Sequence, residues 1–459
     1  MHFVRKEAGR YYLHPIDRDY AFGRIRKGEI SDRNETETLR YTQFALLHRG
    51  AEYFKQTRLP REQWKTIEAA AKVLLEIDYN YLDLWGYYQL VIDLYERLQD
   101  KTTNLKINGR LLLGLGHVYR RMGYYEKANN YLQRALDNSR LAKDRWGEEM
   151  ALGDLGILYY VLEQYTSAND YFKQALIIAR GINDRRSEGI WLGSLGACYC
   201  VFGQTLQAVE YTKQALAIAR EMRDQRRETV LLDQLASSYV CLGQIEHATY
   251  DIHQALTISR TIGFREREAW QLNLLAEMHI DGGRYDSALQ HATASLTIAA
   301  EIGISRFSSN GNITLALAHL YSGDLPAALQ AALVARQYDE PRNIHFVFSQ
   351  LGVIALRQGY HTTAQEAFTT AIAKANSIFE LNNQDYFEAW DTKGLAYSGL
   401  ALCESSEHVP KAIEAYQAAR ALCKDVGIVN RVLRLCDALA VADEKGILAE
   451  VRKAAAGEK

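Results

Sequence analysis

The chain has little proline, little charge imbalance and no long apolar run. Only five of its 459 residues are proline, which suits a mostly helical chain, because proline breaks helix interiors. The formal net charge is −2, so we expect no overall basic field of the kind that draws nucleic acid. No apolar run approaches the ~20 residues needed to cross a bilayer, and we expect no signal peptide. These absences predict a cytoplasmic protein that binds neither nucleic acid nor membranes.

Residues that carry chemistry have no catalytic or metal-binding spacing. The six cysteines show neither disulfide nor zinc patterns, so we expect buried free thiols in a reducing compartment. The twelve histidines are scattered, without metal spacing or a consistent acidic neighbour. No Gly-x-x-x-x-Gly-Lys-Ser/Thr phosphate loop is present. We therefore expect no enzyme activity, no metal site, no cofactor and no nucleotide-binding domain in this chain.

An internal repeat of forty residues runs through most of the sequence. An alanine recurs at this step, and a second small residue follows each alanine after seven positions. A fixed period of this length predicts a solenoid, in which each unit packs on its neighbours and the stack offers an extended binding surface. The recurring alanines are Ala128, Ala168, Ala208, Ala248, Ala288 and Ala328.

One repeat, residues 109–148, has the pattern of two amphipathic helices. Leu115 and Tyr119 lie on one helical stripe, and Gly123 permits a turn into a second stripe that begins at Ala128. Small residues in both stripes indicate that the two helix axes approach closely. The sequence therefore predicts an all-α fold, a right-handed superhelical solenoid of antiparallel helix pairs.

This pattern resembles the tetratricopeptide repeat in a forty-residue form. The Leu-Gly-x-x-Tyr of residues 115–119, the glycine turn and the two small residues of the second helix occupy that family's positions. The resemblance implies seven repeats over residues 105–383 and a degenerate eighth over 384–423. Residues 424–459 then form capping helices over the last apolar face.

The N-terminal region does not repeat. Residues 9–21 resemble a strand and helix at the end of the winged-helix domain in STAND-class signalling ATPases, which include the NB-ARC proteins. In that family a hydrophobic-His-Asp tripeptide opens the helix, and its His contacts the bound nucleotide. The resemblance implies this role for His14 where a nucleotide-binding domain is present, although Pro15 replaces the acid. An ordinary packing or surface histidine is the alternative.

Two further segments, residues 59–66 and 74–86, resemble the linker and first hairpin of bacterial STAND proteins with repeat sensors. We therefore expect a winged-helix remnant over residues 1–30. A helical linker and an atypical first hairpin are expected over residues 31–104.

In tetratricopeptide proteins, one arc of the first helix of each repeat lines a concave groove. The resemblance implies a groove that grades from basic through apolar to acidic. We expect Trp270 and Tyr160 to dominate an interface, and Asp233, Glu277 and Asp281 to attract a cationic segment. The alternative is that some of these residues only pack the superhelix. The predicted groove residues are Arg110, His117, Arg120, Arg121, Ile157, Tyr160, Ile190, Asp233, Trp270, Asn273, Glu277, Asp281, Asn310 and Tyr321.

Together these features predict a non-enzymatic binding module, the sensor arm of a bacterial STAND-type signalling protein whose ATPase domain is absent from this chain. A protein, a peptide or a small inducer would bind in the groove, and a STAND ATPase domain is a further expected partner. Two alternatives stay open. One is a stand-alone scaffold that joins two proteins. The other is a regulator like the peptide-pheromone receptors, although residues 1–60 show no helix-turn-helix.

Overall fold

The computed structural model divides into two compact units, and each unit is described by itself. The first comprises residues 1–158 with 174–183, and the second comprises residues 159–173 with 184–459. The structure describes residues 4–7, 10–13, 92–93, 95–96, 98–99, 104–303, 305–338, 344–382 and 386–458.

A short β-hairpin stands near the N-terminus. Strand β1 (Val4–Glu7) pairs antiparallel with β2 (Arg10–Leu13). We expected a strand near residues 9–13, and β2 lies there; its partner β1 was not expected. His14 lies outside the described residues, as does most of the segment expected to be a winged-helix remnant, so both expectations stay predictions.

The remaining regular elements of the described chain are helices, arranged in pairs. In the first unit, α6 (Leu105–Arg121) packs against α7 (Tyr125–Leu141). A Cβ on Gly116 would lie 2.6 Å from the Leu132 side chain, so this small residue permits the close crossing. Ala128 and Ala135 are fully buried in the same seam. Helices α8 (Arg145–Val161) and α9 (Tyr165–Gly181) contribute residues to both units.

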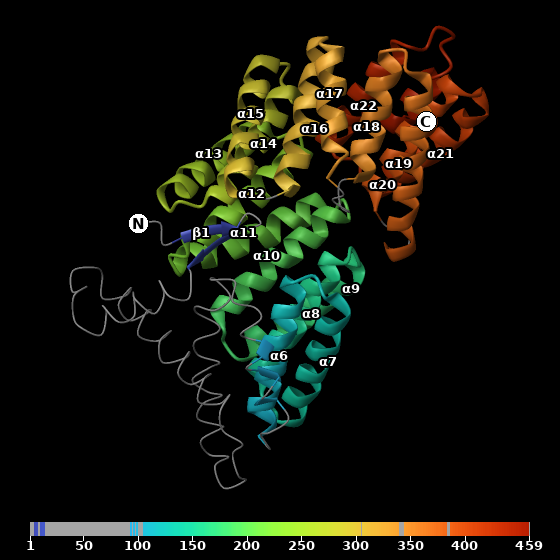
Figure 1. Cartoon of the computed structure of the whole chain (residues 1–459). Coiled ribbons are helices and arrows are strands. Elements are labelled where there is room, and N and C mark those ends of the chain that lie inside the picture. Colours follow the sequence, from blue (N-terminus) through green and yellow to red (C-terminus); the bar gives the residue numbers. More distant parts are fainter. Residues whose placement is uncertain are drawn as a thin grey trace. The chain divides into compact units, whose positions relative to one another are not determined.

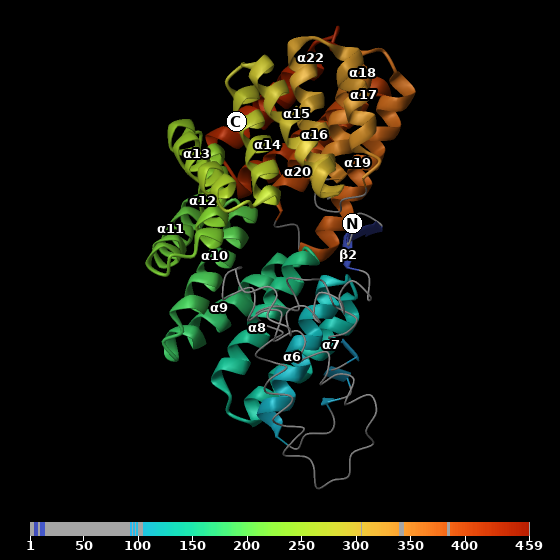
Figure 2. The same ribbon diagram turned by 60° about the vertical axis from the view of Figure 1, so that its left-hand side comes forward.

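In the second unit, the first helix of each repeat (A helix) packs on the second (B helix), and the B helix packs on the next A helix. Successive A helices also touch one another, as expected for stacked repeats. Figure 1 shows this order from α10 to α21, and Figure 2 shows it from α10 to α20. The A helices are α10 (Arg185–Val201), α12 (Gln225–Cys241), α14 (Arg265–Asp281), α16 (Ser305–Ser322), α18 (Ile344–Arg357) and α20 (Phe387–Cys403). The B helices are α11 (Thr205–Glu221), α13 (Ile245–Thr261), α15 (Tyr285–Ile302), α17 (Leu325–Ala335), α19 (His361–Asn382) and α21 (Val409–Leu422), with the short 3-10 helix η3 (Ser406–His408) before α21.

The residues that set the repeat act as the sequence predicts. Gly203 has a φ of +70° in the turn between α10 and α11, a conformation that L-residues with a side chain rarely adopt. A Cβ on Gly196 would lie 2.4 Å from the Thr212 hydroxyl and 3.2 Å from the Ala208 carbonyl oxygen. The all-α arrangement of consecutive helix pairs is thus confirmed.

Stacked tyrosines account for part of the chain's 29 tyrosines. In the first three repeats a tyrosine ring on the A helix stacks on a tyrosine ring of the following B helix, at the forty-residue step. In the fifth repeat two histidines take the same places, with ring centroids 5.0 Å apart. The tyrosine pairs are Tyr119–Tyr131, Tyr159–Tyr171 and Tyr199–Tyr211, with centroids 5.4, 5.3 and 5.1 Å apart.

The two last helices take different positions. Helix α23 (Ala449–Ala456) packs on α21 and α20 and joins the apolar core of the last repeats, as a capping helix does. Helix α22 (Val426–Ala440) contacts the A helices α12, α18 and α20, and its Cys436, Ala438 and Leu439 are buried in the same core. Both views of the ribbon draw α22 beside α18 (Figures 1 and 2). None of the helices in the described ranges has the length and apolar character needed to cross a membrane.

Candidate binding groove

Two carboxylates lie one turn apart at the C-terminal end of α14. They are Glu277 and Asp281, and Asp281 is the last residue of the helix. One turn earlier, Asn273 Nδ2 donates to Glu277 Oε1 over 2.9 Å. A helix C-terminus already carries partial negative charge on its unpaired carbonyls, so acids here are unfavourable unless a cation is present. We call Asn273, Glu277 and Asp281 the acidic site.

The cation at the acidic site comes from α22 of the same chain. Arg431 donates to Asp281 Oδ2 from Nε at 3.0 Å and from Nη2 at 2.9 Å, and its Nη1 lies 3.3 Å from Glu277 Oε2. Arg434 donates to the other carboxylate oxygen of Asp281, and its Nη1 donates to the Asp281 backbone oxygen over 3.3 Å. Two guanidinium groups therefore neutralise the end of α14, in the charge-assisted geometry that gives strong hydrogen bonds.

The electrostatics agree with this pairing. Burial raises the pKa of Glu277 and the nearby Asp281 raises it further, whereas Arg431 opposes both. Burial lowers the pKa of Arg431, but Asp281 and Glu277 more than offset it, so the net shift is upward. Burial also raises the pKa of Tyr321, and Arg434 opposes that shift. Tyr321, another predicted groove residue, therefore lies within electrostatic reach of the same cluster.

Helix α22 is seated along its whole length. Near its start, a Cβ on Gly427 would lie 1.9 Å from the Val240 carbonyl oxygen, which shows how closely α22 approaches the end of α12. Just before the helix, Thr205 Oγ1 donates to the Asp425 carboxylate. Near its end, Arg357 Nη1 on α18 donates to the Ala438 carbonyl oxygen over 3.3 Å. Helix α22 thus crosses the C-terminal ends of α12, α14 and α18.

Asp233 does not belong to the acidic site, which corrects the predicted acidic trio. It is only 1% exposed, and it accepts a hydrogen bond from Gln271 Nε2 over 2.8 Å. Arg267 lies 3.8 Å from its other oxygen. Burial raises the pKa of Asp233 to about 8, against the opposing effects of Arg267 and Gln271. Its position on α12 faces the seam with α14, so it offers no charge to a ligand in the groove.

Tyr160, one of the three predicted apolar groove residues, packs against a buried aromatic cluster. The Tyr160 ring packs edge-on to Tyr165 at 5.2 Å, and Tyr165 lies 5.8 Å from Tyr386. Phe379 and Trp390 belong to the same cluster. The residues at the start of the second unit therefore pack against the junction of α19 and α20, about 200 residues further along the chain.

The predicted basic residues have acidic neighbours within the first unit. Arg110 Nε donates to Asp144 Oδ2 over 3.3 Å. Arg120 Nη2 and His117 Nδ1 lie 3.6 and 3.5 Å from Asp154 Oδ1. These pairings reduce the positive charge that the predicted basic residues offer to a ligand. The other predicted groove residues are Arg121, which is exposed, and Ile157, Ile190, Trp270 and Asn310, which are partly buried.

Sequence reasoning missed Arg431 and Arg434 because residues 424–459 were assigned to the end of the solenoid. One signal was available. The two arginines are three residues apart on one helical face, and two acids four residues apart end α14. This spacing allows the two arginines to pair with the two acids, but no feature of the neighbouring sequence indicates that the two segments meet.

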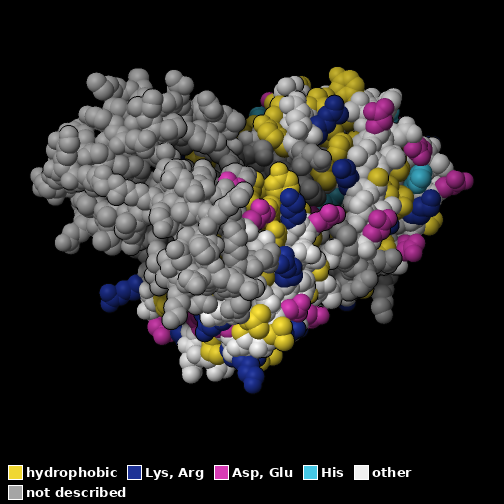
Figure 3. Space-filling model, turned by 60° about the horizontal axis from the view of Figure 1, so that its bottom comes forward, with side chains coloured by type: hydrophobic (Ala, Val, Ile, Leu, Met, Phe, Trp, Pro, Cys, Tyr) yellow, Lys and Arg dark blue, Asp and Glu magenta, His cyan; other side chains and the backbone are white. Residues whose placement is uncertain are grey.

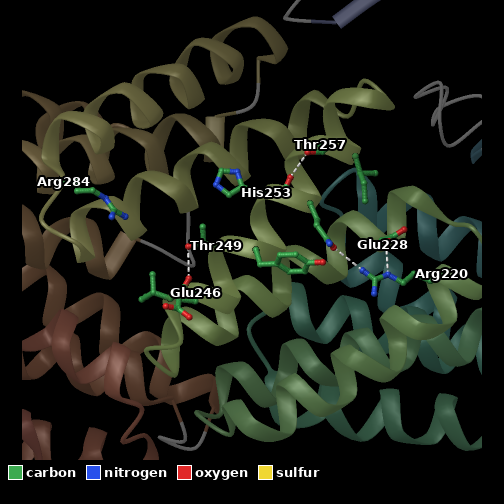
Figure 4. Close-up of a pocket in the computed structure, with 11 residues that line it drawn as sticks. Arg220, Glu228, Glu246, Thr249, His253, Thr257 and Arg284 are labelled. Carbon is green, nitrogen blue, oxygen red and sulfur yellow. Dashed lines mark hydrogen bonds and ion pairs between the residues drawn. The ribbon is translucent and has the colours of Figure 1, made fainter.

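A shallow, open concavity of about 1020 Å³ lies along α13. Figure 4 shows Arg220, Glu228, His253 and Arg284 around it. Arg220 Nε donates to Glu228 Oε1 over 2.8 Å, so this wall is held by an internal ion pair. Positive and negative side chains are interspersed over the described part of the face that Figure 3 shows. The described residues contain no group of three or more side chains placed to hold a metal ion.

Comparisons with known proteins agree with the repeat pattern. Two tetratricopeptide-repeat family models match residues 111–145 and 147–221. The chain is therefore a helical-repeat protein that carries tetratricopeptide repeats. No curated protein sequence gives a significant match.

Several solved structures have a similar fold. A Rap protein complexed with Competence and Sporulation Factor is 15% identical, with a TM-score of 0.52 over 80% of this chain and 95% of that one. NprR in complex with its cognate peptide NprX is 17% identical, with a TM-score of 0.51 over 75% and 98%. A STAND protein with a tetratricopeptide repeat sensor from Pyrococcus horikoshii is 16% identical, with a TM-score of 0.48 over 82% and 57%. The first two likenesses establish the fold alone, and the third is too weak to carry an argument.

Proposed function

We propose that this chain is a non-enzymatic binding module that recognises a protein or peptide segment on the face formed by its A helices. One observation carries the proposal: the acidic site holds the arginines of a helix rather than those of a neighbouring repeat. A surface that accepts a helix from its own chain has the shape and charge to accept one from another. The bound peptide in the NprR complex, on a similar fold, is consistent with this use.

We further propose that the module is the sensor arm of a STAND-type signalling protein, with an ATPase domain as a partner. The support is the sequence resemblance of residues 9–21, 59–66 and 74–86 to that class. A receptor for a regulatory peptide is the alternative, and the Rap and NprR complexes favour it. A STAND ATPase fused to this chain, or encoded beside it, would support the sensor arm. A scaffold would have neither.

Selection from a displayed peptide library on the immobilised full chain tests the binding proposal. We expect enriched peptides to be basic and to lose binding when Glu277→Gln and Asp281→Asn are introduced together, because both charges at the end of α14 disappear. Glu246→Gln is the matched control, since Glu246 is an exposed acid on α13, outside the acidic site. If the selected peptides bind all three proteins equally, the A-helix face is not the recognition surface.

A further inference from the structure

Helix α22 has the features of a docked ligand rather than of a further repeat. Its outward face is exposed at Val426, Asn430 and Asp437, and its inward face carries Arg431 and Arg434. Its main neighbours along the array are the A helices α12, α18 and α20, with a further contact from Cys436 to Tyr416 of α21, so most of its length lies on the face that the repeats share. A helix from a further repeat would instead stack on the end of the array.

The hydrogen bonds from α22 to the acidic site are of the kind that would also bind an arginine-bearing helix from another protein. Arg431 and Arg434 reach the same carboxylate from successive turns, and the backbone oxygen at the end of α14 adds a third acceptor. The negative end of the helix dipole adds to the attraction. Arg431 is 35% exposed and Arg434 is 28% exposed, so neither arginine is sealed into a core.

The chain on either side of α22 holds it as a tethered segment. Before it, Cys423 packs against the turn at Gly203, and the Asp425 carboxylate accepts a hydrogen bond from Thr205. After it, Val441 is 67% exposed and leads into the turns before α23. A tether raises the local concentration of a segment to about the millimolar range, so a weakly bound helix still occupies its site.

We propose that α22 is a built-in competitor for the groove, and that the partner which displaces it is a basic amphipathic helix with two cationic side chains three residues apart. This inference rests on the proposed function, because it names the occupant of the proposed binding face. The A-helix face then has two states. In the closed state Arg431 and Arg434 occupy the acidic site, and in the open state the partner's cationic side chains occupy it. The apparent affinity for a partner is then reduced by the fraction of chains that are closed.

The test uses a fluorescein-labelled peptide of residues 424–442, which carries α22 itself, and the full chain. We expect the Arg431→Glu/Arg434→Glu chain to bind this peptide at least about tenfold more tightly than wild type, because the reversed charges expel its own α22. A peptide with both arginines replaced by alanine should bind neither chain. Arg452→Ala is the matched control, since Arg452 pairs with Asp437 on the exposed side of α22. It should behave as wild type.

The outcomes separate the two ideas. If the peptide binds neither chain, the A-helix face does not take a basic helix, and the proposed function falls with the inference. If it binds both chains equally, the face binds such helices but α22 does not compete, and only the inference falls. Because the charge reversal can perturb folding, hydrogen exchange is also followed on wild type with saturating peptide. Faster exchange of the α22 amides on binding supports displacement, and unchanged exchange overturns it.

Discussion

Replacing Gly427 by alanine tests the seat of α22 without changing any charge. Gly427 is the second residue of α22, and an added Cβ would lie 1.9 Å from the Val240 carbonyl oxygen and 2.8 Å from the Cys241 carbonyl oxygen. Both neighbours are backbone atoms at the end of α12, so no rotamer change relieves the clash. The first turn of α22 must therefore move away by at least about 1 Å to restore an ordinary contact.

The magnitude follows from two opposing effects. Overpacking of a close contact typically costs about 1–3 kcal/mol. Alanine in place of glycine in a helix gains at most about 1 kcal/mol, and less in the first turn. We therefore expect the seating of α22 to weaken by about 1–2 kcal/mol, which increases the open population by roughly 5–30-fold.

Hydrogen exchange followed by mass spectrometry measures this effect on the amides of residues 429–434. These amides should exchange faster in Gly427→Ala, while those of α14 and α16 keep their protection, because repeats couple mainly to their neighbours. Gly181→Ala is the matched control, since a Cβ there meets no atom within 4 Å. Wild-type exchange of α22 in the Gly427→Ala protein would refute its seating on α12.

Three further predictions concern the repeats themselves. Gly196→Leu should cost roughly 2–4 kcal/mol and broaden the thermal melt, because the new side chain enters a crossing where even a Cβ would clash with Thr212. Lowering the pH from 7 to 5 should cost about 2 kcal/mol through His345. Burial lowers the pKa of His345 to about 3, so the fold holds the neutral form while the unfolded chain takes up a proton. Asp233→Asn should stabilise the fold at pH 8 by at least about 1 kcal/mol. Burial raises the pKa of Asp233 to about 8, so this group's contribution to stability is lost as the pH rises toward 8.

Each of these has a direct measurement. A thermal melt of Gly196→Leu identical to wild type would mean that the repeat register is wrong. Urea unfolding at pH 5 and pH 7 gives the loss of unfolding free energy between the two pH values. This loss should be smaller in His345→Leu than in wild type, because the part caused by His345 is absent. An equal loss in the two proteins contradicts the prediction. A less stable Asp233→Asn protein at pH 8 would mean that Asp233 is ionised in the fold and that its attraction to Arg267 outweighs its burial.

The repeat architecture could be derived from the sequence because its determinants are local and recur. Gly196 and its equivalents stand where an A helix crosses its own B helix, less than forty residues away. The tyrosine pairs, such as Tyr199 with Tyr211, are only twelve positions apart. Each copy repeats the same spacing, so the period, the turns and the close crossings are all legible in the chain.

The predicted groove residues stay a prediction, but the structure shows what surrounds two groups of them. Glu277 and Asp281 were expected to favour a cationic segment, and the structure places two arginines on them. Asp233 was assigned to the same set because it shares the helical arc. The arc does not distinguish a residue open to the groove from one covered by the next A helix, and α14 covers Asp233.

Sequence alone therefore determined the period, the helix pairs and the acidic end of α14. Only the tertiary structure decided what fills the site, because Asp281 and Arg431 are 150 residues apart. The Tyr165–Tyr386 contact spans more than 200 residues in the same way. Such contacts depend on the accumulated rotation of all the intervening repeats, which a forty-residue period does not specify.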